Sequence, residues 1–438
     1  MERLTQHLVW LFLLIVAQIS VAHAQDFQSC GQTNCHDNLI SQQVMHPALE
    51  DGCDTCHEGE GEEHPGEQGA EFEISSPVPE LCYDCHDEKN TEKYVHDPVD
   101  EGDCLECHNP HGSPNKFMLE EWPPVNLCET CHDSEIWETK IQHGALKDGE
   151  CNLCHNPHQS NVSKLLKKPT PELCFNCHEE QKEQNELSTV HSPFEDGCLD
   201  CHQPHGGEKK KLLVNTPPLL CFDCHDDLQS EAEEARLVHK PFQDSRACLN
   251  CHSPHASEYS SLMLKDEYNL CYTCHNDEIE GETRKIKNIK SLVIKAKSSH
   301  DPVAEDGCLT CHSPHYTNNP FLLNGAFPEG NYVEAAADSF ALCFDCHDSE
   351  IIESRNGDVT GFRDGNRNLH YLHVNKKKGR TCINCHSVHG SEQAHLITTK
   401  VPFGKWTMPV KYQRTETGGS CLPGCHEEKS YNNKKPLP

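Results

Sequence analysis

The feature that constrains this chain most is a short pattern of two cysteines, two residues apart, followed at once by a histidine. Thirteen regular copies begin at Cys53, Cys82, Cys104, Cys128, Cys151, Cys174, Cys198, Cys221, Cys248, Cys271, Cys308, Cys343 and Cys382. Two looser copies flank them, CGQTNCH from Cys30 and CLPGCH from Cys421. The fifteen copies use all 30 cysteines, so none is left over for another purpose.

C-x-x-C-H is the attachment signature of c-type haem, in which two thiols bond to the porphyrin and the histidine ligates its iron. One helical turn brings residues three and four apart to the same side, so both sulfurs and the imidazole can face one porphyrin. Disulfides, a zinc ribbon or a redox-active C-x-x-C would not place histidine after every second cysteine. We therefore expect fifteen covalent haem c groups.

The expected attachment residues are the cysteine pairs Cys30 and Cys35, Cys53 and Cys56, Cys82 and Cys85, Cys104 and Cys107, Cys128 and Cys131, Cys151 and Cys154, Cys174 and Cys177, Cys198 and Cys201, Cys221 and Cys224, Cys248 and Cys251, Cys271 and Cys274, Cys308 and Cys311, Cys343 and Cys346, Cys382 and Cys385, and Cys421 and Cys425. The expected proximal iron ligands are His36, His57, His86, His108, His132, His155, His178, His202, His225, His252, His275, His312, His347, His386 and His426.

Composition indicates that the haems form the core. Hydrophobic residues are 35% of the chain, aromatic residues 6%, and the formal net charge is −33. So little apolar side chain cannot offset the ordering entropy of an ordinary polypeptide of this length. With fifteen haems in residues 25–438, each haem has about 28 residues, too few to enclose it separately. The haems must pack on one another.

Two kinds of motif alternate along the chain. A motifs, as in VHSPFEDGCLDCHQPHGG (190–207), have a histidine before and a histidine after; they begin at Cys53, Cys104, Cys151, Cys198, Cys248, Cys308 and Cys382. B motifs, as in PELCFNCHEE (171–180), lie between the A motifs, and the last B motif begins at Cys421. The Cys30 motif precedes the whole series. With its H-x-P and P-H-G flanks, the repeat resembles the doubled C-x-x-C-H multihaem cytochromes c. We expect an elongated array, mostly irregular with short α-helices and little β-structure.

Sixteen histidines remain after those of residues 1–24 and the motifs are set aside: His46, His64, His96, His111, His143, His158, His191, His205, His239, His255, His300, His315, His370, His373, His389 and His395. A lone loop histidine is usually a surface residue, but a pair recurring in phase around seven A motifs is not explained that way. All sixteen are candidate distal iron ligands. The pairs around the seven A motifs account for fourteen, and His370 or His395 would supply the fifteenth.

The histidine that follows each A motif, here called the trailing histidine, is the informative one. His205 comes from the same side of its haem as His202, so it cannot reach the opposite axial position of that iron. We therefore predict that the trailing histidines ligate neighbouring haems and link them into one chain; they are His64, His111, His158, His205, His255, His315 and His389.

The N-terminus has the three parts of a secretory signal peptide, with Arg3, an apolar run at 8–17 and AHA at 22–24. We expect cleavage after Ala24; an uncleaved anchor is the alternative, although the run is shorter than the roughly 20 residues that span a bilayer. No later segment is apolar enough to cross a membrane. The expected divisions are 1–24, 25–78 with the first two haems, 79–280 with regular repeats, and 281–438 with longer haem-free inserts.

The resemblance implies electron transfer along a haem chain through or out of the cell envelope, and it implies no catalytic residue. Expected partners are other envelope redox proteins, with an outer-membrane porin or an extracellular metal acceptor as alternatives. The periplasm is the expected compartment; an outer-membrane-associated or extracellular location is the alternative. The acidic charge excludes nucleic acid.

Two other functions stay open. A multihaem reductase would keep one open-site haem, often with lysine in place of the motif histidine, and no C-x-x-C-K occurs here. A filament would need one complementary contact at each end. The basic segment 284–298 either docks an acidic partner or a membrane surface, or folds against haem propionates.

Overall fold

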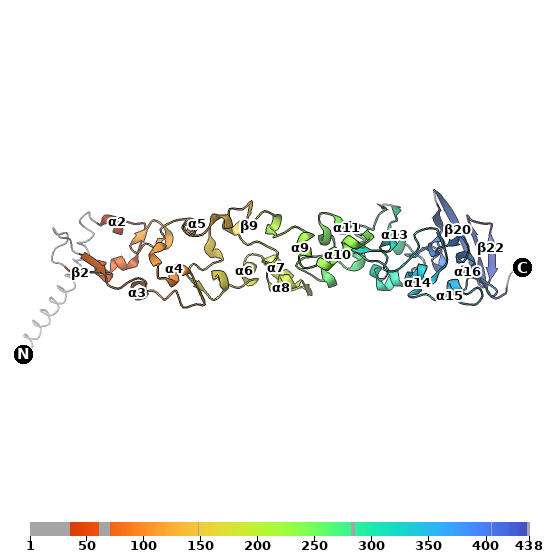
Figure 1. Ribbon diagram of the computed structural model, residues 1–438, viewed down its shortest axis with the longest axis horizontal. Helices are drawn as coiled ribbons and strands as arrows, with labels where there is room; N and C mark the ends of the chain where they lie inside the picture. Colours follow the sequence, from red (N-terminus) through yellow and green to blue (C-terminus); the bar gives the residue numbers. More distant parts are fainter. Residues whose placement is uncertain (1–35, 61–70, 148, 282–284, 404, 436–438) are drawn as a thin grey trace, which may run out of the picture. The chain divides into compact units, whose positions relative to one another are not determined.

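The computed structural model describes residues 36–60, 71–147, 149–281, 285–403 and 405–435 (Figure 1). The predicted signal peptide, Cys30, Cys35 and His64 lie outside the described residues. The chain divides into two units, one of residues 1–179 and 196–214 and the other of residues 180–195 and 215–438. Within the described ranges, no helix is both long and apolar enough to cross a membrane.

Helices are short throughout, as the sequence predicts. The α-helices are α2 (Asp37–Ile40), α3 (Glu80–Tyr83), α4 (Asp97–Asp100), α5 (Pro124–Cys128), α6 (Glu172–Phe175), α7 (Glu179–Gln184), α8 (Ser192–Asp196), α9 (Leu219–Phe222), α10 (Asp226–Glu234), α11 (Lys240–Gln243), α12 (Glu267–Cys271), α13 (Ile289–Ile294), α14 (Ala341–Phe344), α15 (Glu350–Glu353) and α16 (Leu369–Val374). Turns of 3-10 helix include η2 (Cys53–Thr55), η3 (Cys104–Glu106), η4 (Lys116–Met118), η7 (Cys151–Leu153), η8 (Ser163–Leu165), η9 (Lys210–Leu212), η10 (Ala247–Asn250), η11 (Ser260–Leu262), η13 (Cys308–Thr310), η14 (Pro320–Leu322), η16 (Cys382–Asn384) and η17 (Ala394–Leu396).

Strands are mostly two residues long and pair in antiparallel twos. The pairs are β1 (Val44–Met45) with β5 (Gly112–Ser113), β4 (Tyr94–Val95) with β7 (Gln159–Ser160), β6 (Ile141–Gln142) with β9 (Gly206–Gly207), β8 (Thr189–Val190) with β11 (Ala256–Ser257), and β10 (Leu237–Val238) with β14 (Tyr316–Thr317). Other pairs are β2 (His57–Glu60) with β3 (Glu71–Ile74), β12 (Ile279–Glu280) with β13 (Lys285–Ile286), β15 (Tyr332–Val333) with β18 (Gly379–Arg380), and β16 (Arg363–Asp364) with β17 (Arg367–Asn368).

The first five of these pairs join each repeat to the next. The segment before one A motif pairs with the segment after the following A motif, as β6 does with β9. At Gly112 a Cβ would lie only 2.6 Å from the Val44 carbonyl oxygen, whereas the equivalent positions of β7, β11 and β14 carry Gln159, Ala256 and Tyr316. The repeats are therefore linked by backbone hydrogen bonds.

A four-stranded antiparallel sheet ends the described chain, and the sequence did not predict it. Its order is β19 (Lys400–Phe403), β20 (Trp406–Thr415), β21 (Gly418–Pro423) and β22 (Lys429–Asn432) (Figure 1, blue). Beside it, Phe340, Ile352 and Val374 form a small cluster of buried side chains. Only nine hydrophobic side chains are buried among the described residues, as expected of a chain whose core is not made of side chains.

Candidate functional site

Twelve of the thirteen regular motifs, from the one at Cys82 onward, are folded into one helical turn. In the B motif at Cys82, the backbone N–H of His86 donates to the Cys82 carbonyl 2.9 Å away, and His108 bonds Cys104 in the same way at 3.1 Å. The same bond recurs at His132, His155, His178, His202, His225, His252, His275, His312, His347 and His386. A four-residue bond of this kind brings the first cysteine and the histidine to one side, which is what attachment to one porphyrin requires.

Motif histidines face a second histidine that lies outside their own motif. Twelve such pairs have ring centroids 5.9 to 6.4 Å apart: His46 and His86, His57 and His111, His96 and His132, His108 and His158, His143 and His178, His155 and His205, His191 and His225, His239 and His275, His252 and His315, His300 and His347, His312 and His389, and His370 and His386.

This separation fits one metal ion between two imidazoles. Rings in van der Waals contact face to face would lie about 3.5 to 4 Å apart. A metal–nitrogen bond of about 2 Å on each side, plus about 1.1 Å from each nitrogen to its ring centre, gives about 6.2 Å. The pairs therefore suit a six-coordinate haem iron with two axial histidines.

The pairing follows one rule along the repeat. A trailing histidine faces the proximal histidine of the preceding A motif, as His205 faces His155 at 6.0 Å. The histidine before an A motif, the leading histidine, faces the following B motif, as His143 faces His178 at 6.0 Å. Backbone pairing fixes both at once, because the His143 N–H donates to the His205 carbonyl 2.9 Å away. One backbone contact between two repeats therefore sets the positions of a trailing and a leading histidine together.

In six of the seven A motifs the motif histidine is oriented by a backbone carbonyl nine residues later. Nδ1 of His108 lies 2.9 Å from the Phe117 oxygen, and Nδ1 of His252 lies 2.8 Å from the Ser261 oxygen. The same contact joins His155 to Lys164, His202 to Lys211, His312 to Phe321 and His386 to His395. A carbonyl can only accept, so Nδ1 donates and Nε2 keeps its lone pair for a metal.

These carbonyls belong to residues in the left-handed region, with φ of 57° at Phe117 and 53° at Ser261. The next residue, Met118 or Leu262, is left-handed too, at 56° in both cases. Two such residues in a row are costly for side chains with a Cβ. The turn recurs after the A motifs at Cys104, Cys151, Cys198, Cys248, Cys308 and Cys382, so we interpret it as the device that points the carbonyl at the histidine.

The leading histidines are oriented in the same way by the proline of P-H. Nδ1 of His96 lies 2.9 Å from the Pro157 oxygen, and Nδ1 of His239 lies 2.9 Å from the Pro314 oxygen. His191 makes the equivalent contact with Pro254. At these positions the motif histidine of an A motif is anchored, whereas for a B motif it is the leading histidine facing it that is anchored. Outer hydrogen bonds of this kind fix tautomer and ring orientation.

Burial favours the neutral form of several facing imidazoles, which is the form that metal ligation requires. Desolvation lowers the pKa of His205 and of His315, with smaller contributions from neighbouring histidines. The effect is largest at His370, where burial and then His386 and His373 lower the pKa to about 4. A neutral imidazole of this kind has a ring-nitrogen lone pair available to a metal.

Successive motifs are neighbours in space within each unit. The first sulfur of a B motif lies beside the first sulfur of the next A motif; the pairs are Cys82 and Cys104, Cys128 and Cys151, Cys174 and Cys198, Cys221 and Cys248, Cys271 and Cys308, and Cys343 and Cys382. Burial first, and then a cysteine of the next B motif, raises the pKa of Cys107, Cys154, Cys251, Cys311 and Cys385. Each unit therefore contains an unbroken row of attachment sites.

Comparison with protein families agrees with this geometry. A family model described as the doubled CXXCH motif matches six segments, residues 46–91, 96–136, 143–183, 191–230, 239–280 and 300–351. The chain belongs to the doubled CXXCH motif family. No curated protein matches its sequence. Each matched segment holds one A and one B motif, so twelve motifs lie within the family's pattern, and this protein is a multihaem c-type cytochrome.

Across the parts of the chain that the structure describes, no three His, Cys, Asp or Glu side chains converge as a metal site would require. The histidines come in facing pairs instead, and such a pair could hold one haem iron between two imidazoles.

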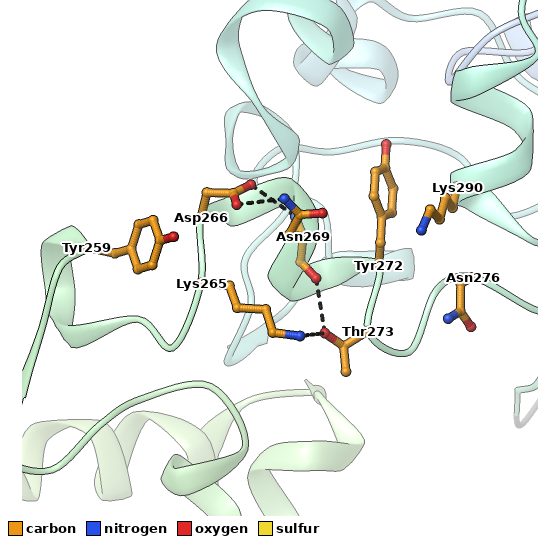
Figure 2. Close-up of a pocket in the computed structure, with 8 residues that line it drawn as sticks. All are labelled: Tyr259, Lys265, Asp266, Asn269, Tyr272, Thr273, Asn276 and Lys290. Atoms are coloured by element: carbon orange, nitrogen blue, oxygen red, sulfur yellow. Dashed lines mark hydrogen bonds between the residues drawn. The ribbon is translucent and has the colours of Figure 1, made fainter.

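One open pocket of about 560 Å³ lies beside the B motif at Cys271 of this cytochrome (Figure 2). Tyr272 and Thr273, the two residues between its cysteines, line it with Lys265 and Lys290. Thr273 donates to the Asn269 carbonyl at 3.0 Å, and Lys290 lies 5.9 Å from the Tyr272 ring centre. The polar groups contact one another, and we assign no reaction to the pocket.

Sequence reasoning missed the orienting carbonyls. Their signal was present as a recurring Leu or Met ten residues after the A motif histidine, in Met118, Leu165, Leu212, Leu262, Leu322 and Leu396. Of the predicted distal candidates, His395 is exposed and meets a motif histidine through its backbone carbonyl. At the end of the basic segment 284–298, after α13, Lys297 N–H donates to the carbonyl of Ser391, five residues beyond the last A motif, at 2.8 Å.

Proposed function

We propose that this cytochrome conducts electrons along fifteen haems, each held between two histidines, through or out of the cell envelope. The observation that carries the proposal is the repeated histidine pair at about 6 Å, twelve times in phase with the motifs. The haem supplies one-electron chemistry when bound. The chain supplies spacing, because its attachment sites follow one another without interruption in each unit.

The pairing rule assigns every distal ligand. Leading histidines His46, His96, His143, His191, His239, His300 and His373 would serve the seven B haems, and trailing histidines would serve the preceding haem in the A series. By this rule His64, outside the described residues, serves the Cys30 motif. No A motif follows Cys382, so no trailing histidine is left for it. His370 takes that place at 6.4 Å from His386, and His395 is left over.

The last haem is assigned to His373 and His426. His373 is the leading histidine of the A motif at Cys382, so the rule pairs it with the B motif at Cys421. Burial lowers the pKa of His373, and His426 is among the charged neighbours that lower it further. Its Nδ1 donates to the Leu369 carbonyl at 2.6 Å, which leaves Nε2 for iron. One turn of α16 would thus hold the last two haems.

Two axial histidines on every iron favour a conductor over an enzyme. A side chain at each axial position excludes water and substrate, and six-coordinate iron reorganises little on electron transfer. We therefore propose no catalytic residue. A multihaem reductase would need one vacant position, which carbon monoxide binding to the reduced wild-type protein would reveal.

We propose export by the N-terminal segment and partners among envelope redox proteins. The periplasm is the first compartment proposed; a porin-associated or extracellular location, with a metal acceptor, is the alternative. Haem propionates add roughly 15 to 30 negative charges to the chain's −33. Such a field attracts basic redox partners and cationic metal species and repels nucleic acid.

The test is to remove one haem from the row. Holoprotein tethered between two electrodes should pass current, and a Cys271→Ala/Cys274→Ala variant should lose it because the row is interrupted. The matched control, Cys421→Ala/Cys425→Ala, removes a haem at the end of the series and should conduct like wild type. Equal currents from the interrupted variant and the wild type would contradict the conductor.

A further inference from the structure

The charge of this chain is distributed unevenly. Residues 371–438 contain eleven Lys and Arg against four Glu and no Asp, a formal charge of +7. Because the whole chain carries −33, the other 370 residues together carry a formal charge of −40. A contrast of this size between two parts of one chain indicates an electrostatic docking function for the smaller, basic part.

The basic part is built around the four-stranded sheet, whose two faces differ. Tyr412 of β20 pairs with Cys421 of β21, and Met408 Sδ lies 3.7 Å from Cys425 Sγ, so one face carries the last haem motif. Paired residues lie on the same face of a sheet. Lys411, which pairs with Leu422, therefore lies on the other face.

That outer face is exposed and cationic. Lys411 and its neighbours Thr407, Pro409 and Gln413 are exposed, as is Lys400, the cross-strand partner of Pro409. Leu422 adds an apolar side chain that is 36% exposed. Neither Lys400 nor Lys411 forms an ion pair with any carboxylate among the described residues. The sheet thus presents free positive charge on the side opposite the last haem motif.

We propose that this outer face docks the acidic repeats of a second copy of the same chain. Charge complementarity carries the choice of partner, because each copy offers both the basic sheet and a region with a formal charge of −40. The two surfaces differ, so the contact is heterologous and can add further copies.

The test is sedimentation velocity of the holoprotein at two ionic strengths. At about 0.01 M salt, where the Debye length is about 30 Å, the wild type should sediment faster than a monomer. At about 1 M salt, where it is about 3 Å, the shift should be lost. Lys405 is exposed between β19 and β20, next to this face. The variant Lys400→Glu/Lys405→Glu/Lys411→Glu should sediment as a monomer at both salt concentrations, with an unchanged haem content and absorption spectrum showing that it has folded.

A matched control separates this face from net charge. Lys140→Glu/Lys147→Glu/Lys182→Glu changes the charge equally at exposed residues elsewhere and should keep the low-salt shift. A wild type that stays monomeric at low salt would overturn the proposal, and so would loss of association in the control. Binding of the monomer to phosphatidylglycerol vesicles would assign the face to a membrane instead. None of these outcomes depends on whether the haems conduct.

Discussion

The imidazole of His205 lies 6.0 Å from that of His155, the proximal histidine of the preceding A motif. The P-H element therefore does two things at once. Its histidine faces the haem site of one repeat, and its backbone carbonyl accepts from His143, which faces the site at His178. A short segment thus holds two haem positions in register.

Replacing His205 with alanine should open one axial position without loss of covalent haem. The affected iron is the one held by His155, so the reduced variant should gain about one carbon monoxide site per chain. His395→Ala is the matched control, because that ring is exposed and is left over by the pairing rule. It should bind no more carbon monoxide than wild type. A His205→Ala variant that binds no more carbon monoxide than the control would show that His205 is a surface histidine and not an iron ligand.

The assignment of His373 predicts a site on the last haem. His373→Ala should gain one carbon monoxide site, and adding Cys421→Ala/Cys425→Ala should remove it together with the haem. If the site persists in the combined variant, His373 serves another iron. Carbon monoxide titration with intact mass measurement distinguishes these results.

Intact mass of the mature protein should show fifteen haems. Thirteen haems would mean that the variant motifs at Cys30 and Cys421 both stay empty, and fourteen would mean that one of the two is empty. Cys30→Ala/Cys35→Ala and Cys421→Ala/Cys425→Ala should each lose the mass of one haem. A variant that loses nothing identifies its motif as unoccupied.

Much of this arrangement could be predicted from the sequence, because the residues that attach a haem lie close together in the chain at a fixed spacing. The motif turn at Cys82 to His86 and the alternation of A and B motifs follow from local patterns. Which histidine faces which haem does not, because the pairing depends on strands such as β6 and β9, two residues long and distant in sequence. The four-stranded sheet was missed for a different reason: β20 contains Pro409 and two glycines begin β21, residues that usually indicate turns.

The left-handed turn after each A motif should respond to backbone substitution. Ser261 has φ of 53°, so Ser261→Gly should raise the free energy of unfolding by roughly 0.5 kcal/mol, the relief of strain less the added freedom of the unfolded chain. Ser261→Pro cannot adopt that φ and should displace the carbonyl that accepts from His252. Chemical denaturation followed by haem absorption measures both, and equal stabilities would contradict the role given to the turn.

Expression without the cytochrome c maturation machinery should yield an unfolded, protease-sensitive chain. The nine buried hydrophobic side chains of the described residues cannot supply a core on their own. Limited proteolysis with circular dichroism measures the outcome, and a compact apoprotein would show that haem does not drive folding.

The most direct test is the position of iron in a density map of the holoprotein. The account predicts that His205 Nε2 lies about 2 Å from the iron whose other axial ligand is His155. An iron bound by His155 together with any other sixth ligand, or a His205 ring with no iron within about 4 Å, would contradict the pairing between repeats on which the haem chain depends.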